Sequence, residues 1–259
     1  MEEIMKKGTY LAIIASLSLM YGQAMVFAAN NTTGSVGIVI KGDNNTVSSS
    51  NSITLGNEIS SLGGANVAIG YKSKAGNQEH PLGPNQANGA TAVGMGAQAT
   101  NYRATALGDY TVASGKDSLG LGTTAQATGE RSLAAGLSSQ ASGVNAIAIG
   151  DKAVSSSSDS VAIGEKASAA GSQAIAIGSA SSASGSYSVA LGQNAKAGDD
   201  RSVALGNSSE TAEAVSTASM TVGEKTYQTA GGRAAGTVSV GNQYIKRTIT
   251  NVAAGRVLD

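Results

Sequence analysis

The side chains that most often carry catalysis or bind metals are scarce in this chain and occupy no shared position. His80 is the only histidine among 259 residues and there is no cysteine, so neither a nucleophilic triad nor a metal site is expected around it. The glycine-rich stretch Gly94-Met95-Gly96 lacks the strand–helix context of a phosphate-binding loop. We expect no enzyme, no cofactor and no metal. The aspartates form no column that would make a paired-carboxylate site and are interpreted as solvated turn residues: Asp43, Asp109, Asp151, Asp159, Asp199 and Asp200.

Glycine is the residue type that recurs at a fixed spacing. Twelve glycines follow one another with a constant 14-residue period, apart from the longer step between Gly70 and Gly94. Nearly every one closes an apolar-small-apolar triplet, as in Ile147-Ala148-Ile149-Gly150. A unit this short cannot bury its own apolar face and must stack on its neighbours, which predicts a solenoid. The twelve are Gly42, Gly56, Gly70, Gly94, Gly108, Gly122, Gly136, Gly150, Gly164, Gly178, Gly192 and Gly206.

The composition excludes an ordinary globular core. The chain has 35 glycines, one phenylalanine and no tryptophan, and much of its 41% hydrophobic content is alanine. Disorder is the obvious alternative, but a disordered chain has no reason to keep branched aliphatics three and one residues before a glycine. The formal net charge is zero with 13% charged residues, so nothing indicates a nucleic-acid partner.

Each 14-residue unit is interpreted as two short strands and two turns. With the glycine as position 0, positions −3 and −1 are branched aliphatics, while −2 and −4 are small. Positions +3 and +5 are Ala or Ser between polar neighbours, which indicates a second strand with a small inner face and a wet outer face. Position +7 is usually glycine, and we expect it to adopt the left-handed backbone of a tight turn. Stacked in parallel, these units form an all-β roll.

A single roll of this kind would leave one apolar or small-residue face exposed to solvent. It exposes either its small residues or its aliphatic rows to water along its whole length, and a patch of that size normally marks an interface. We therefore expect an obligate oligomer with the first strands inside and the second strands outside. The pattern alone does not count the subunits.

Residues 1–28 have the layout of a secretory signal peptide. Lys6 and Lys7 precede an apolar run, and Val26-Phe27-Ala28 ends in a small residue before the chain turns polar. A membrane anchor is the alternative, because the run is nearly long enough to span a bilayer. We favour cleavage, since Gly22 and Gln23 interrupt the run, and therefore expect an exported protein.

The repeat is interrupted twice. Within the expected repeat domain, residues 29–206, the segment 77–87 lengthens one unit and holds both prolines and His80; it is expected to loop off the roll as a contact site, a tolerated insertion or a clasp between subunits. After Gly206 the register is lost. Residues 207–235 are expected to be an irregular connector, and residues 236–259 to begin a neck that leads to a stalk absent from this chain.

At these residues the sequence resembles a known family. Units such as Ser160-Val161-Ala162-Ile163-Gly164 resemble the head repeats of trimeric autotransporter adhesins, the YadA-like family. The phrase Val238-Ser239-Val240-Gly241, followed by Arg247 to Gly255, resembles the neck of that family. The residues that carry the neck resemblance are Arg247, Ile249, Thr250, Asn251, Val252, Ala253, Ala254 and Gly255.

The resemblance implies a fold and a function. It implies a left-handed parallel β-roll, a homotrimer, and display on the surface of a Gram-negative bacterium, where the protein adheres to host extracellular matrix, host cells or other bacteria. The family's C-terminal membrane anchor is not found in this sequence, so we expect either the cell surface or outer membrane, or secretion if the protein has no anchor. The competing hypothesis is a rigid spacer of a surface fibre, with no ligand of its own.

Overall fold

The computed structural model describes residues 32–33, 38–41, 43–47, 52–77 and 89–253. It divides into two compact units, Met1–Asp117 and Ser118–Asp259. The expected signal peptide, nearly all of the insertion at 77–87, His80, Gly42, Ala254 and Gly255 lie outside the described residues.

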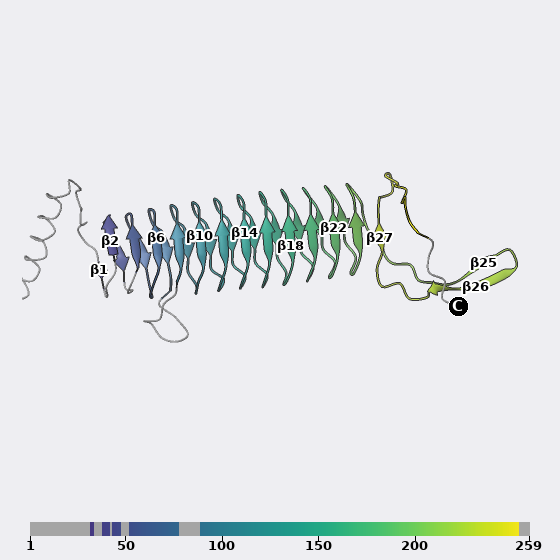
Figure 1. Ribbon diagram of the computed structural model, residues 1–259, viewed down its shortest axis with the longest axis horizontal. Helices are drawn as coiled ribbons and strands as arrows, with labels where there is room; N and C mark the ends of the chain where they lie inside the picture. Colours follow the sequence, from purple (N-terminus) through teal and green to yellow (C-terminus); the bar gives the residue numbers. More distant parts are fainter. Residues whose placement is uncertain (1–31, 34–37, 42, 48–51, 78–88, 254–259) are drawn as a thin grey trace, which may run out of the picture. The chain divides into compact units, whose positions relative to one another are not determined.

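The first unit consists of coils that each give one strand to each of two parallel sheets (Figure 1). One sheet has two-residue strands in the order β1 (Thr32–Thr33), β3 (Thr46–Val47), β5 (Ser60–Ser61), β7 (Lys74–Ala75), β9 (Gln98–Ala99) and β11 (Val112–Ala113). The other has longer strands in the order β2 (Ile38–Lys41), β4 (Ile53–Leu55), β6 (Val67–Ile69), β8 (Thr91–Val93) and β10 (Thr105–Leu107).

The second unit repeats this arrangement and adds a hairpin. Its two-residue strands are β13 (Gln126–Ala127), β15 (Gln140–Ala141), β17 (Val154–Ser155), β19 (Ser168–Ala169), β21 (Ser182–Ala183) and β23 (Lys196–Ala197). The other sheet is formed by β12 (Leu119–Leu121), β14 (Leu133–Ala135), β16 (Ile147–Ile149), β18 (Val161–Ile163), β20 (Ile175–Ile177), β22 (Val189–Leu191), β24 (Val203–Leu205) and β27 (Val238–Ser239). The hairpin pairs β25 (Thr217–Val222) with β26 (Lys225–Gly231).

The pairing register confirms the predicted parallel β-solenoid of 14-residue coils. In the second unit, Ile147, Ala148 and Ile149 pair in parallel with Val161, Ala162 and Ile163, each with the residue 14 positions later. In the first unit, Val67 pairs with Thr91, so the extra residues between Gly70 and Gly94 leave the strand register intact. Like residues therefore stack in rows, as the repeat requires.

Small side chains fill the interior of each coil. The residues at −2 and +5, such as Ala162 and Ala169, have no solvent exposure, and the residues at −4 and +3, such as Ser160 and Ala167, are equally buried. Several buried serines satisfy their hydroxyls on nearby turn carbonyls: Ser132 Oγ donates to the Gly129 oxygen at 2.7 Å and Ser181 Oγ to the Gly178 oxygen at 2.8 Å. With so little side-chain volume inside, the backbone ladder between coils must carry much of the stability.

The glycine of each triplet is required for two reasons. Gly150 has φ +129°, a backbone conformation that side chains disfavour. A Cβ on Gly150 would also lie 2.6 Å from the carbonyl carbon and oxygen of Gly164 in the next coil. The same geometry recurs from Gly136 to Gly192, so the 14-residue glycine period reflects the close stacking of one turn on the next.

The prediction that the glycines at +7 are left-handed is wrong. Gly129, Gly143, Gly171 and Gly185 do not have positive φ; a Cβ on Gly143, for example, would lie 2.0 Å from the Ser157 oxygen. Left-handed residues instead stand at +2 and −5 and carry side chains, such as Lys152 (φ 54°) and Asn145 (φ 57°). Close approach between coils explains glycine at +7, although Asn101, Ser157 and Asp199 show that some coils accommodate a Cβ there.

The solenoid register resumes after Gly206. Val203 and Ala204 pair in parallel with Val238 and Ser239, a separation longer than two of the 14-residue coils. Glu210 forms a parallel bridge with Lys196, so the chain begins the next coil at Glu210 before the hairpin interrupts it. The segment 207–235, expected to be irregular, thus holds the hairpin β25–β26 inserted into a coil that β27 completes. The domain boundaries themselves stay predictions.

Candidate binding surface

The outward residues of the longer strands form an aliphatic stripe, defined here as the −3 and −1 residues of β12 to β24. None of these side chains is fully buried in the single chain, and Ile149, Leu191 and Leu205 are exposed. Two continuous rows of aliphatic side chains at the spacing of β-strands form a larger apolar surface than a solitary protein normally exposes. The stripe consists of Leu119, Leu121, Leu133, Ala135, Ile147, Ile149, Val161, Ile163, Ile175, Ile177, Val189, Leu191, Val203 and Leu205.

Polar side chains at the turns of the second unit form ladders between coils. Arg131 Nε donates to Asn145 Oδ1 at 2.7 Å, and Asn145 Nδ2 donates to Asp159 Oδ1 at 2.8 Å, each one coil further along. Lys166, whose Nζ lies 2.8 Å from Glu165 Oε1, lowers the pKa of Glu165 below its ordinary value by hydrogen bonding and by charge. These groups are solvated and hold turns, which supports the interpretation of the aspartates as turn residues.

An aromatic cluster lies on consecutive coils of the first unit. Tyr71, Met95 and Tyr110 are exposed; the Gly96 N–H donates to the Tyr71 oxygen at 2.8 Å and the Tyr110 N–H to the Met95 oxygen at 2.7 Å. Gly96 leaves room for the Tyr110 ring, since a Cβ there would lie 2.8 Å from Tyr110 Cδ1. The sequence reasoning missed this cluster, because its members stand at two different positions of the repeat, +1 and +2.

The surroundings of Tyr71 make it accessible to a ligand on one side. Its hydroxyl donates to Glu58 at 3.1 Å, and the Lys72 ammonium lies 4.9 Å from the centre of its ring. A hollow of about 390 Å³ beside the ring is lined by Leu55, Gly56, Asn57 and Tyr71. An exposed ring next to an apolar hollow, bordered by charges of both signs, is a suitable contact point for a ligand.

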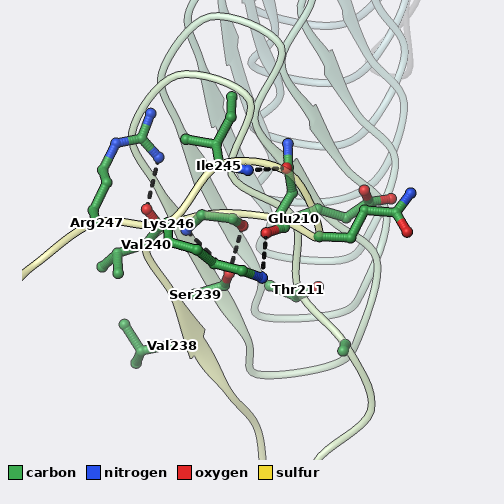
Figure 2. Close-up of a pocket in the computed structure, with 12 residues that line it drawn as sticks. Glu210, Thr211, Val238, Ser239, Val240, Ile245, Lys246 and Arg247 are labelled. Carbon is green, nitrogen blue, oxygen red and sulfur yellow. Dashed lines mark hydrogen bonds between the residues drawn. The ribbon is translucent and has the colours of Figure 1, made fainter.

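Arg247 closes the second unit's last complete coil (Figure 2). One guanidinium nitrogen donates to the Val240 oxygen at 2.6 Å and to Ser209 Oγ at 3.1 Å, and the other donates to the Asn207 oxygen at 2.7 Å. The guanidinium carbon is 3.3 Å from the place of a Cβ on Gly206. In earlier coils, the glycine of the next coil covers each such turn. At Gly206, Arg247 takes that place.

Asn242 folds the following turn back onto this end. Its Nδ2 donates to the Ser208 oxygen at 2.7 Å, and its Oδ1 accepts the N–H groups of Tyr244 and Ile245 at 2.8 Å each. The resulting open cavity of about 490 Å³ is drawn in Figure 2 and includes Val238, Ile245 and Arg247 in its lining. Of the other expected neck residues, Ile249 and Val252 are exposed and Asn251 has φ 60°.

Of the residues that the sequence singled out, the structure stacks the register glycines on one another and brings one neck residue, Arg247, to the last of them. Within each unit the described glycines of the register stack in a column, and Arg247 meets the end of the column of the second unit. Among the described residues, no group of three His, Asp or Glu side chains could hold a metal ion. Nor does the described part of the chain contain a helix with the length and hydrophobicity needed to cross a bilayer.

The coils and their glycine columns define a class of protein: a parallel β-solenoid of 14-residue coils. The family model for the YadA head domain repeat matches residues 86–111, 113–139, 127–153, 141–164, 155–181 and 183–209. This part of the chain is therefore a run of YadA head repeats.

The proteins similar to this chain include an autotransporter adhesin and a collagen-binding domain. The autotransporter adhesin BtaE of Brucella suis is 50% identical over 48 residues, which are 18% of this chain and 6% of BtaE. The match thus spans only a small part of the curated relative. The crystal structure of the collagen-binding domain of the Yersinia adhesin YadA aligns with a TM-score of 0.46 and 24% identity, covering 74% of this chain and 89% of that one.

Proposed function

We propose that this chain is the head of a bacterial surface adhesin of the trimeric autotransporter type, exported and displayed by a Gram-negative cell. The run of YadA head repeats is the observation that carries this proposal. Such a head attaches the bacterium to host extracellular matrix proteins, host cells or other bacteria. It does so by binding, without catalysis.

The aliphatic stripe supports a homo-oligomer, and the resemblance to the head repeats of trimeric adhesins supports three copies. A charge-free apolar surface that follows every coil is best covered by the same surface of other copies, because rows of equal spacing match along their whole length. The polar second sheet of each copy then faces water. Three copies present every ligand contact three times, so weak individual contacts add up to avid attachment.

The aromatic cluster supplies the ligand contact in this proposal. Binding of the purified protein to immobilised collagen, fibronectin and host cells is compared with that of the double variant Tyr71→Ser/Tyr110→Ser. The control is Tyr187→Ser, whose ring is 52% exposed against 55% for Tyr110 but lies in the second unit. We expect binding by the wild type and the control and a loss of roughly tenfold or more in the double variant. Absence of binding by the wild type to all three surfaces and to other bacteria contradicts the adhesin.

A second test separates the adhesin from a rigid spacer. Deleting the segment 91–132 removes three whole coils, including Met95 and Tyr110, and joins Ala90 to Leu133 with the register kept. A spacer keeps its function at the new length. An adhesin that binds through the aromatic cluster loses attachment.

A further inference from the structure

The hairpin β25–β26 has one face on which apolar side chains gather and one polar face. Met220 stands opposite Tyr227, and Val222 opposite Lys225, in its antiparallel ladder. The intervening pairs, Ser219 with Gln228 and Thr221 with Thr226, face the other side because successive residues of a strand alternate. The Thr221 and Thr226 hydroxyls lie 3.1 Å apart on this polar face.

The apolar face is open to solvent in the single chain. Met220, Val222 and Tyr227 are 51%, 59% and 52% exposed, and β25 and β26 have each other as their main neighbours among the described strands. A two-stranded ribbon is marginally stable in water unless another layer covers its apolar side. The hairpin therefore needs a partner surface.

The same unit carries an apolar surface that is also uncovered. Val238 and Ile245 line the open cavity of about 490 Å³ at the end of the coils, and no residue of β25 or β26 is part of that lining (Figure 2). Val238 is 72% exposed and pairs with Val203 in the row of the aliphatic stripe. The cavity thus continues the surface that the proposed trimer covers.

We propose that the hairpin is a clasp between subunits: its Met220–Tyr227 face docks in the cavity at Val238 and Ile245 of a neighbouring copy of this chain. Donor and acceptor are different surfaces, so the contact is heterologous, and three such contacts related by rotation close a ring. The inference rests on the proposed homotrimer and adds the segment that locks it. Because the hairpin is inserted into a coil that β27 completes, it supplies the donor without disturbing the coil register.

Cross-linking tests which surfaces meet. The chain has no cysteine, so the full chain carrying Tyr227→Cys and Ile245→Cys can be treated with a short bismaleimide and run on a denaturing gel. We expect covalent dimers and trimers. The control carries Gln228→Cys, the adjacent residue on the polar face, with Ile245→Cys, and should give at least roughly tenfold less product because its thiol points away from the cavity. Product confined within one chain, or equal yields from both pairs, overturns the clasp.

Charge variants test what the contact contributes. Met220→Asp/Tyr227→Asp and Ser219→Asp/Gln228→Asp place the same two charges on neighbouring cross-strand pairs, on opposite faces. In sedimentation velocity of the full chain over a dilution series, we expect the first to dissociate at a concentration roughly tenfold or more above that of the second, since it would bury unpaired charge. Equal dissociation refutes the clasp and leaves the trimer standing. A wild type that sediments as a single chain refutes both.

Discussion

The substitution Gly150→Ala tests whether the close stacking of coils, and not glycine flexibility alone, sets the 14-residue period. Gly150 combines positive φ (+129°) with a Cβ position 2.6 Å from the Gly164 carbonyl. Three other glycines separate these two properties. Gly143 has the close approach without positive φ, Gly223 has positive φ (+64°) with nothing within 4 Å, and Gly198 has neither, with its nearest neighbour 4.0 Å away.

The expected cost follows from the geometry. Positive φ at a residue with a Cβ costs about 1–3 kcal/mol. Relieving a 2.6 Å contact to an ordinary separation of about 3.4 Å opens the coils locally by about 0.8 Å. The Gly164 N–H donates to the Ile149 oxygen at 2.8 Å beside this contact, so that bond would stretch beyond hydrogen-bonding range and cost a further 1–3 kcal/mol or so. We expect Gly150→Ala to destabilise the protein by about 3 kcal/mol or more.

Thermal unfolding of the four alanine variants, followed by circular dichroism at one protein concentration, measures the difference. About 3 kcal/mol corresponds to a fall in Tm of roughly 6–12 °C for a unit of this size. Gly143→Ala, whose Cβ would lie 2.0 Å from the Ser157 oxygen, should be destabilised at least as much as Gly150→Ala. Gly223→Ala should be intermediate, and Gly198→Ala should match the wild type. If Gly143→Ala or Gly150→Ala unfolds at the temperature of Gly198→Ala, the stacking argument is refuted.

Further substitutions test the remaining parts of the account. Deleting the segment 214–234 restores the one-coil spacing between Val203 and Val238. The chain should therefore keep its β-type circular dichroism spectrum and the protection of its coil amides from hydrogen exchange. Loss of that protection in β22 and β24 would show that the coils need the hairpin to fold. Arg247→Met should cost about 1 kcal/mol and raise amide exchange at residues 203–209 by several-fold, whereas Lys246→Met should leave that segment unchanged. Ile163→Asp should be severe because it puts three charges into the covered stripe, while Lys166→Ala should be nearly silent; similar Tm values for the two would contradict the assignment of faces. Lys166 lowers the pKa of Glu165, so the stability that the pair contributes is present above about pH 4.3 and disappears as the pH falls through the lowered pKa. The small Tm difference between wild type and Lys166→Met should therefore shrink from pH 7 to about pH 3. A Tm difference that grows at low pH would contradict this.

The sequence was sufficient to predict the coil because each coil is specified by local residues. The triplet Ile147-Ala148-Ile149 before Gly150 predicts a three-residue strand, and β16 has those bounds. The split between the small inner row of Ala148 and the aliphatic outer rows also follows from alternation. Local patterns did not predict the backbone conformation at +7. There the close approach of Gly143 to Ser157 depends on how the coils stack, and a glycine required for that reason looks the same in the sequence as a glycine required by a turn.

The end of the repeat was harder to predict because an insertion hides the period. Val238-Ser239-Val240-Gly241 matches the strand template, but its distance from Val203-Ala204-Leu205-Gly206 is not a whole number of coils. Leaving out the segment 214–234 would have recovered the period, and the turn at Gly223-Glu224 between Val222 and Lys225 is the available signal. The aromatic cluster also depends on stacking, since Tyr71 and Tyr110 meet Met95 only when successive coils are in register.

The mass of the folded protein in solution tests the central claim most directly. The account states that the aliphatic stripe is covered by two further copies, so sedimentation equilibrium or native mass spectrometry of the purified exported chain should give three times the mass of one chain. Ile163→Asp should lower that mass, and Lys166→Asp should leave it unchanged. A wild-type protein that stays soluble and folded at the mass of a single chain would contradict the account.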